Sequence, residues 1–307
     1  MSAGILMLGA GGFLGSALAR RLSRDGCRVY RVMRQPAPPF GQNDSVHPGD
    51  ISDVALMREL LTRCNTVFHL ASATTPGSSA RQPSLEAEFN LLPTLRFLDV
   101  MQDFPGRRLI FVSSGGALYG NPAIEPAPET HPTTALSYHG AGKIALETFL
   151  LTFSRLTGTG LTVLRPSNLY GPAQSLKSGF GLVRTMLQHV KQGTTMQIWG
   201  DGETVRDFLY IDDMVQACCQ VRAQGDAVGE VFNVGAGNGH SINQIRQLAE
   251  KITGRAIDVI YQPQRQVDVT HIVLDCSRIR SKLGWSPAVP LEEGLAITWQ
   301  WLQSQAT

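Results

Sequence analysis

Short apolar runs alternate with amphipathic segments along the first half of the chain, and this alternation restricts the possible folds more than any other feature. Five runs are apolar on both faces, as strands of a buried parallel sheet are: GILMLGA, CRVYRVM, TVFHLAS, RLIFVSS and LTVLRPS. Amphipathic segments such as FLGSALARRLSRDG and SDVALMRELLTRC lie between them. This order predicts an α/β fold built on a doubly wound parallel sheet.

The pattern loosens from about Gly171 onward into loops, short strands and helices such as SINQIRQLAEKITG. We expect a smaller α/β domain here, laid over the carboxyl edge of the sheet, where ligands bind in such folds. The predicted division is residues 1–168 for the sheet domain, with a return of the chain near 208–237, and mainly 169–307 for the smaller domain. Trp199 and Trp285 are expected to anchor the core of the smaller domain.

The composition excludes several classes of function. A hydrophobic content of 43% with 17% charged residues is typical of a globular protein, and a net charge of +2 without a basic block argues against nucleic-acid or membrane partners. The five cysteines have no C-x-x-C spacing, and the chain enters its first strand pattern without a basic leader, so we expect reduced thiols in the cytoplasm. No His/Cys/Asp cluster has metal-ligand spacing, so no metal site is predicted.

A glycine-rich stretch directly follows the first predicted strand. In GAGGFLG, the residues Gly9, Gly12 and Gly15 have G-x-x-G-x-x-G spacing and open the first helix. Glycine allows a tight turn, close approach of the backbone to a pyrophosphate, and close packing of helix on strand. The helix N-terminus adds free amides and the positive end of its dipole. The motif therefore predicts that residues 1–168 bind a dinucleotide.

The end of the second predicted strand bears on the choice of dinucleotide. An acidic residue there would bind the ribose hydroxyls and select NAD, but Met33 occupies that place and Arg34 follows it. A guanidinium suits a 2′-phosphate, so the cofactor is predicted as NAD(P), with Arg34 favouring NADP; a solvated surface arginine is the alternative. Further on, GDISD places Asp50 and Ile51 where an adenine ring can be held.

Eight stretches in this order resemble the extended short-chain dehydrogenase/reductase family, in particular its nucleotide-sugar epimerases and dehydratases such as UDP-glucose 4-epimerase. They are GAGGFLG, GDISD, VFHLASA, FVSSGGALYG, LRPSNLYGP, GDGETVRDFLYIDD, VFNVGAG and KLGWSP with LEEGL. The resemblance covers nearly the whole chain. It implies a Rossmann-type sheet domain for the cofactor and a smaller domain that binds a nucleotide sugar.

The resemblance also implies roles for individual residues. Those expected to hold the cofactor are Gly9, Gly12, Phe13, Leu14, Gly15, Arg34, Asp50, Ile51, Leu70, Ala71, Ser72, Thr74, Ser113, Lys143 and Pro166. Those expected to hold the sugar nucleotide are Asn168, Arg206 and Arg265. A diphosphate requires fixed cationic donors, and the planar fork of arginine provides them. The alternative for each arginine is a surface ion pair.

The catalytic position departs from the family pattern. The family has Tyr-x-x-x-Lys on one helix face, and here YHGAGK places His139 four residues before Lys143. At about 100° per residue, Tyr138 would lie about 140° around the helix from Lys143. The position that usually holds a polar relay residue is Gly115, and Ser114 is the nearest hydroxyl.

Three interpretations of this centre are open. His139 is the acid/base, because its ordinary pKa of about 6.5 suits proton transfer near neutral pH, with a water bridging its shorter reach. In the second, the helix begins after Tyr138 and the turn swings that side chain inward. In the third, the site binds its ligands but has lost its chemistry.

The function predicted from the resemblance is NAD(P)-dependent epimerisation of a nucleotide sugar at C4, through a bound 4-keto intermediate. A 4-keto-sugar reductase and a dehydratase are alternatives, although SSGGALYG lacks the Asp-Glu pair of the family's dehydratases. A non-catalytic dinucleotide- and nucleotide-sugar-binding protein is the alternative of another class. The segments 84–101 and 143–156 are apolar on more than one face, so a two-fold helical homodimer is predicted, with core burial as the alternative.

Overall fold

The chain divides into two compact units, each of which is described by itself. The computed structural model describes residues 4–176, 181–224, 229–265 and 268–305. The first unit comprises Met1–Ser114, Tyr138–Arg165 and Val215–Phe232, and the second comprises Gly115–Ser137, Pro166–Met214 and Asn233–Thr307. The ligand-binding roles predicted for the two parts of the sequence remain predictions.

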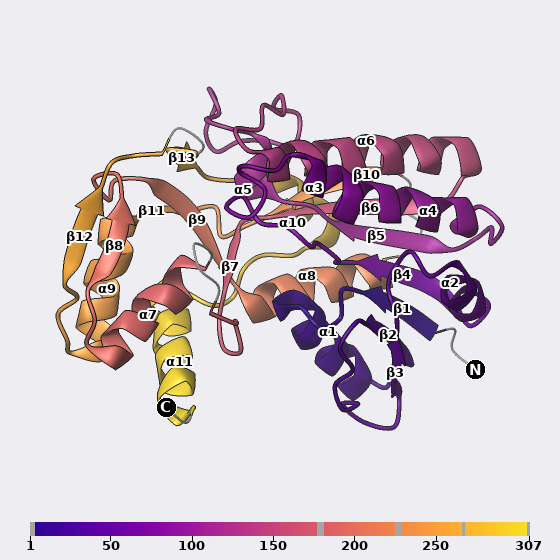
Figure 1. The fold of residues 1–307 in the computed structure, drawn as a ribbon, viewed down its shortest axis with the longest axis horizontal. Helices are drawn as coiled ribbons and strands as arrows, with labels where there is room; N and C mark the ends of the chain where they lie inside the picture. The colour runs from indigo at the N-terminus through magenta and orange to yellow at the C-terminus, as the bar shows by residue number, and fades with distance from the viewer. Residues whose placement is uncertain (1–3, 177–180, 225–228, 266–267, 306–307) are drawn as a thin grey trace. The chain divides into compact units, whose positions relative to one another are not determined.

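A seven-stranded sheet has the order β10-β6-β5-β4-β1-β2-β3 (Figure 1). Its strands are β1 (Gly4–Leu8), β2 (Val29–Met33), β3 (Asp44–Pro48), β4 (Cys64–His69), β5 (Arg108–Val112), β6 (Gly160–Pro166) and β10 (Glu230–Val234). The pairs from β3 through β1 and β4 to β6 run parallel. The order reverses between β1 and β4, so the predicted doubly wound, Rossmann-type sheet is confirmed.

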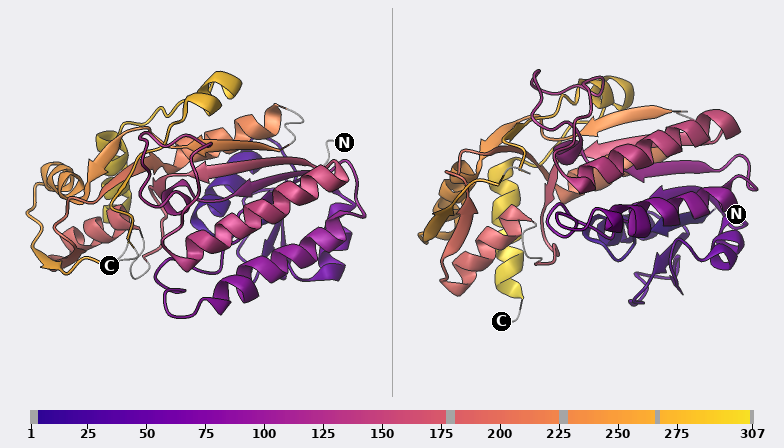
Figure 2. Two further views of the ribbon diagram at one scale, coloured as in Figure 1. Left: turned by 90° about the horizontal axis from the view of Figure 1, so that it is seen from above. Right: turned by 45° about the horizontal axis from the view of Figure 1, so that its top comes forward.

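Helices cover both faces of this sheet, which explains why its strands are apolar on both sides. In Figures 1 and 2, α4 (Leu92–Met101) and α6 (Tyr138–Thr157) lie on one face, and α1 (Phe13–Arg24) lies on the other. Leu14, Leu18 and Leu22 recur every four residues along α1 and are buried. On α2 (Val54–Leu61) the Asp53 side chain caps the helix by accepting the Leu56 N–H.

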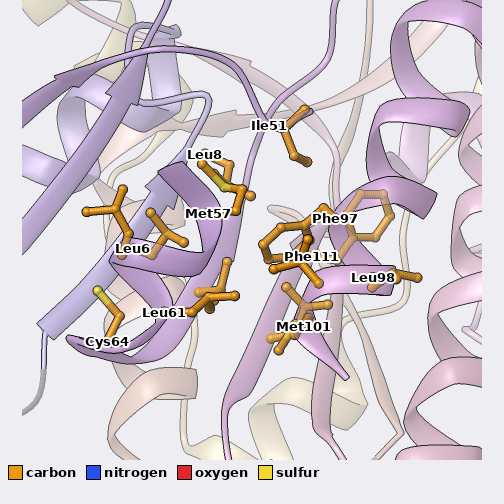
Figure 3. Close-up of a cluster of buried hydrophobic side chains, with 14 of the residues drawn as sticks. Leu6, Leu8, Ile51, Met57, Leu61, Cys64, Phe97, Leu98, Met101 and Phe111 are labelled. Carbon is orange, nitrogen blue, oxygen red and sulfur yellow. The ribbon is translucent and has the colours of Figure 1, made fainter. Parts of the chain in front are cut away.

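The main hydrophobic core fills the space between the sheet and the helices α2 and α4 (Figure 3). Leu6 and Leu8 of β1 meet Met57 and Leu61 of α2, and Phe111 of β5 lies near Phe97, Leu98 and Met101 of α4. The strand register brings Leu8, His69 and Phe111 level with one another. The residues that follow β1, β4 and β5 therefore emerge at one edge of the sheet.

The second unit is built around β9 (Val205–Tyr210). This strand pairs in parallel with β7 (Asn168–Tyr170) and β13 (His271–Ile272), and antiparallel with β11 (Gly239–Ser241). A separate two-stranded sheet joins β8 (Met196–Trp199) to β12 (Val259–Gln262). The helices are α5 (Gly115–Leu118), α7 (Leu182–Gln192), α9 (Ile242–Thr253), α10 (Ser277–Leu283) and α11 (Leu291–Ser304); α8 (Ile211–Ala223) begins here and continues into the first unit.

The two tryptophans expected in the core of this unit differ. Trp285 is 1% exposed, and its indole N–H donates to the Asp213 carbonyl at 3.1 Å. Trp199 is 42% exposed, so its assignment to the core was wrong. Burial alternates along β8: Met196 and Ile198 point inward and Trp199 points outward.

None of the helices in the described part of the chain combines the length and the hydropathy needed to cross a bilayer. The described residues also contain no group of three or more His, Cys, Asp or Glu side chains arranged to hold a metal ion.

Candidate active site

The turn between β1 and α1 has no room for side chains at two of its glycines. Gly9 has φ of +83°, and a Cβ there would lie 2.6 Å from the Ala71 nitrogen. A Cβ on Gly15 would lie 2.3 Å from the Gly9 carbonyl oxygen. Gly12 precedes the helix without a side-chain cap, so the first amides of α1, from Phe13 onward, are left for a ligand. Such a cradle suits a phosphate group.

The predicted cofactor residues after β4 and β5 emerge beside this turn. The Leu70 N–H donates to the Leu8 carbonyl at 2.9 Å, which continues the strand pairing and brings Ala71 against Gly9. Ser72 is exposed, and its hydroxyl donates to the Thr74 carbonyl at 3.3 Å. Ser113 follows β5 and is 5% exposed, and its buried hydroxyl oxygen has no hydrogen-bond partner within the described residues. An unpartnered buried hydroxyl at this edge is suited to receive a ligand.

Residues at the β2 and β3 ends have different surroundings. Arg34 is exposed directly after β2, where a phosphate can reach it. The Oδ1 atom of Asp50 accepts from the backbone N–H and the hydroxyl of Ser52 at 3.1 and 3.0 Å, so half of that carboxylate is engaged in its own turn. Ile51 is 8% exposed and belongs to the main core (Figure 3), so its side chain packs against other apolar side chains.

His139 and Lys143 lie on one face of α6, as their spacing predicts. Lys143 is 6% exposed, and its Nζ donates to the Val112 carbonyl at 3.2 Å, at the end of β5. The same atom lies 5.0 Å from the centroid of the Phe111 ring. His139 Nδ1 lies 3.2 Å from Thr74 Oγ1. The helix thus brings the predicted acid/base and the predicted lysine to the carboxyl edge of the sheet.

Burial shifts the protonation of both groups. It lowers the pKa of Lys143 to about 8, although the carboxylates of Glu86 and Glu147 act in the opposite direction. Burial, and then the charge of Lys143, lower the pKa of His139 to about 4, while Glu86 raises it. The imidazole is therefore neutral near pH 7, as a proton acceptor must be.

The other candidates for the catalytic centre are less well placed. Tyr138 is already part of α6, and its side chain is 48% exposed. Tyr138 could serve as the acid/base only if the helix began after it, and in this structure the helix begins at Tyr138 itself. Ser114 is half-buried at the end of the first unit. Gly115 and Gly116 open α5, so this turn supplies no further hydroxyl.

Two residues that sequence reasoning missed surround His139. Glu86 ends α3 (Ser84–Glu86), and Asn90 lies one turn later in η1 (Ala87–Leu91), a π-helical segment that continues into α4. Both are buried, at 6% and 7% exposure. Glu86 Oε1 lies 3.8 Å from His139 Nδ1, and Asn90 Nδ2 donates to Thr74 Oγ1 at 2.8 Å. Two polar residues four apart, on one face of an otherwise largely apolar helical stretch, were the available signal.

The two predicted arginines of the second unit both lie near Asp268. Arg265 donates two hydrogen bonds to Asp268, at 2.8 and 3.1 Å, and its guanidinium lies 5.1 Å from the Trp199 ring centroid. Arg206 donates to the carbonyls of Val205 and Val269. Burial lowers the pKa of Arg206 to about 10, and the charge of Asp268 opposes that shift. The structure thus brings both arginines to the surroundings of Asp268.

Pro166 and Asn168 lie at the start of the same unit. Pro166 is buried at the end of β6, and Asn168 is half-buried in β7. A Cβ on Gly116 would lie 3.3 Å from the Asn168 side-chain oxygen. A larger residue at this position would crowd the Asn168 amide, so Gly116 keeps room for that side chain beside α5.

Comparisons with known proteins agree with this arrangement. Residues 5–235 match the family described as the NAD dependent epimerase/dehydratase family. A UDP-glucose 4-epimerase of Mycolicibacterium smegmatis is 31% identical, over 98% of this chain and 99% of that protein. The relatives also include a dTDP-4-dehydro-6-deoxyglucose reductase of Escherichia coli and an NAD-dependent NDP-hexosamine 5,6-dehydratase.

Solved structures give the same result. A UDP-glucose 4-epimerase of Thermotoga maritima, crystallised with UDP-glucose, is 35% identical with a TM-score of 0.91 and covers 98% of each chain. A UDP-glucose 4-epimerase of Thermus thermophilus in complex with NAD is 27% identical, also with a TM-score of 0.91, over 98% of this chain and 99% of that one. With the family match over most of its length, the chain belongs to the NAD dependent epimerase/dehydratase family of extended short-chain dehydrogenase/reductase enzymes.

Proposed function

We propose that the protein is a nucleotide-sugar 4-epimerase in which His139 takes the place of the family's tyrosine. The observation that carries this proposal is the pair of half-buried, neutral His139 and buried Lys143, which share one face of α6, with Lys143 at the carboxyl end of β5. The 4-epimerases among its relatives support the choice of reaction. The free cysteines support a proposed location in the cytoplasm, where thiols stay reduced.

The residues of the first unit fit a nicotinamide dinucleotide. The cradle at Gly9 and Gly15 would be filled by any Cβ, and the buried Ser113 hydroxyl has no partner among the described residues. When bound, the nicotinamide supplies reversible hydride transfer at the sugar carbon. In this proposal Lys143 binds the nicotinamide ribose, and His139 accepts the proton of the sugar C4 hydroxyl and later returns one. Ser114 provides a nearby hydroxyl.

The residues of the second unit are proposed to hold the substrate. Arg206 and Arg265 would bind the diphosphate of the sugar nucleotide, and Asn168 would add an amide contact. A diphosphate competes with Asp268 for Arg265, and charge-assisted hydrogen bonds to two arginines suit it. The UDP-sugars named with the relatives make a UDP-hexose the first substrate to test.

The test is a product assay on the cofactor-loaded protein with UDP-, dTDP- and GDP-hexoses. An epimerase converts a substrate to its C4 epimer with no net change in cofactor. Net consumption of reduced cofactor with a 4-keto sugar would identify a reductase, and loss of water a dehydratase. Binding of nucleotide sugar without turnover at any pH would establish the non-catalytic alternative.

The dinucleotide is proposed to be NADP in preference to NAD, because exposed Arg34 stands at the end of β2. Replacing Arg34 by alanine is expected to weaken NADPH binding about tenfold, the loss of one charge-assisted hydrogen bond, and to leave NADH binding unchanged. Fluorescence titration measures both. Arg24→Ala, at the far end of α1, is the matched control. Tighter binding of NADH than of NADPH by the unchanged protein would contradict this assignment.

We further propose a two-fold homodimer through the face formed by η1, α4 and α6, which lie together on one side of the sheet (Figure 2). Four large apolar side chains are exposed on it: Phe89, Leu92, Phe149 and Leu156. Exposed apolar side chains gathered on packed helices are typical of an interface.

Replacing Phe149 by glutamate is expected to convert this dimer to a monomer, because the charge would be buried without a partner. Size-exclusion chromatography with light scattering measures the mass. Ile124→Glu, at an apolar side chain that is 64% exposed in the second unit, should leave the dimer intact. A monomeric unchanged protein, or a dimeric Phe149→Glu variant, would refute the proposed interface.

A further inference from the structure

A buried carboxylate with one unsatisfied oxygen faces His139. Glu86 is 6% exposed, and its Oε2 accepts a hydrogen bond from Asn90 Nδ2 at 2.8 Å. Its Oε1 is buried and has no hydrogen-bond partner among the described residues, and it lies 3.8 Å from His139 Nδ1. A buried carboxylate oxygen without a donor is costly, so a nearby N–H is strongly favoured there.

The backbone of α6 is shaped to admit this carboxylate. Gly142 stands next to Lys143, and a Cβ on it would lie 2.9 Å from Glu86 Oε2 and 3.2 Å from Glu86 Cβ. A glycine inside a helix is unfavourable, so its presence here has a packing reason. It lets α3 approach α6 closely enough for Glu86 to reach the Nδ1 side of His139.

The hydrogen bonds of Asn90 determine which atoms donate and which accept among Asn90, Thr74 and Glu86. Asn90 Oδ1 accepts from the Ala73 N–H at 2.8 Å, which orients the amide. Its Nδ2 then donates to both Thr74 Oγ1 and Glu86 Oε2. Thr74 Oγ1 therefore already accepts one hydrogen bond, and its own proton is free to point at His139 Nδ1, 3.2 Å away.

Thr74 and Glu86 thus favour opposite protonation states of His139 Nδ1. The Thr74 hydroxyl favours an unprotonated Nδ1 that accepts its proton, whereas the acceptor-only carboxylate of Glu86 favours Nδ1–H. A carboxylate beside a histidine selects the tautomer with a proton on the facing nitrogen, because the alternative sets two lone pairs against each other. Glu86 Oε1 lies farther from Nδ1, at 3.8 Å, than Thr74 Oγ1, at 3.2 Å, but its full charge favours a proton on the facing nitrogen more strongly than a neutral hydroxyl opposes it.

We propose that Glu86 is a positioning residue that keeps the proton of neutral His139 on Nδ1, so that Nε2 is the atom that exchanges a proton with the sugar hydroxyl. The inference rests on the proposed function. Within the described residues, His139 Nε2 makes no hydrogen bond. In the oxidation step Nε2 would accept the C4 O–H proton, and a bound oxidised nicotinamide would supply the acceptor for the C4–H hydride. Glu86 would then face an imidazolium, and in the return step Nε2 would give its proton back to the C4 oxygen as the hydride is delivered to the opposite face of C4.

The charged groups around His139 are compatible with this role. Glu86 faces it from α3, and Lys143 faces it from α6. Glu147, the next carboxylate along α6, is held by a buried ion pair to Arg165 at 2.6 Å. His69, on β4, is buried and hydrogen-bonded through Nε2 to Thr94 at 2.9 Å. The carboxylate nearest to the imidazole is therefore Glu86, while burial, and then the charge of Lys143, keep His139 neutral until the sugar proton arrives.

The experiment is a nitrogen-15 measurement of the His139 tautomer at pH 7, assigned by its loss in His139→Gln. The unchanged protein should carry the proton on Nδ1. Glu86→Gln, which keeps the shape of the side chain and removes its charge, should shift the tautomer toward Nε2–H, because Thr74 then donates to Nδ1. Thr74→Val should retain Nδ1–H. Glu88→Gln, an exposed glutamate two residues further along the chain, is the matched control.

Kinetics give the second readout. Glu86→Gln should lower kcat by about 10²-fold, as expected for a misplaced acid/base, with KM changed by less than about threefold. A tautomer that Glu86→Gln leaves unchanged, or that Thr74→Val reverses, would overturn the role of Glu86. If no nucleotide sugar is turned over, the proposed function fails separately, and the tautomer measurement still decides whether Glu86 controls Nδ1.

Discussion

Replacing His139 by glutamine is expected to lower kcat by about 10²- to 10⁴-fold, the usual contribution of an acid/base group, with little change in nucleotide-sugar binding. The reason is that His139 is the neutral, half-buried side chain which shares the α6 face with Lys143. Steady-state kinetics with the best substrate, beside calorimetric binding of the same nucleotide sugar, separate the two effects. Tyr138→Phe is the comparison, because that side chain is 48% exposed.

The pH profile follows from the same two groups. Because the pKa of His139 is lowered to about 4, kcat/KM should stay high well below neutral pH and fall only as the imidazole gains its proton. Because the pKa of Lys143 is lowered to about 8, the profile should fall above that pH as the ammonium is lost. A large loss in Tyr138→Phe with full activity in His139→Gln would instead assign the proton transfer to Tyr138.

His139→Tyr tests the alternative that the chemistry has been lost. This variant has the family's Tyr-x-x-x-Lys pattern on an otherwise unchanged helix. If the unchanged protein is silent and the tyrosine variant turns over a nucleotide sugar, the pocket is competent and His139 has switched it off. If the unchanged protein is active and the variant is no faster, His139 is a working base.

The fold was predictable because its signals are local. A parallel sheet covered on both faces requires strands that are apolar on both sides, and the chain shows them as separate runs. The turn at Gly9 and Gly15 was equally visible, since it fits only residues without a Cβ. The spacing of His139 and Lys143 needs only a helix to put them on one face.

The surroundings of His139 were not predictable in the same way. Glu86, Asn90 and Thr74 reach it from other segments, and which segments meet depends on how the helices pack on the sheet. Trp199 shows the same limit: its residue type favours burial, but the position of β8 in its sheet turns it outward. Local pattern thus identified the acid/base candidate, and tertiary packing determined which groups control it.

A charged residue within an apolar strand supplies the largest expected effect on stability. Arg31, in β2, is 1% exposed, and its guanidinium makes two contacts with Asp44 of β3: Nε to Oδ1 at 2.8 Å and Nη2 to Oδ2 at 2.7 Å. Asp44 also accepts the Phe40 N–H at 2.7 Å, and the Phe40 ring lies 4.2 Å from the guanidinium carbon. The pair therefore fixes the edge of the sheet next to the loop that bears Arg34.

Asp44→Ala is expected to lower the free energy of unfolding by about 3–5 kcal/mol, because Arg31 would remain buried without a counter-charge. Urea unfolding followed by circular dichroism measures it. The control is Asp103→Ala, which removes a surface pair with Arg58 whose side chains are both 50% exposed, and should cost at most about 1 kcal/mol. Arg31→Met with Asp44→Leu should recover most of the loss, since removal of both charges leaves neither buried alone. Equal costs for Asp44→Ala and Asp103→Ala would show that the Arg31–Asp44 pair contributes no more than a surface contact.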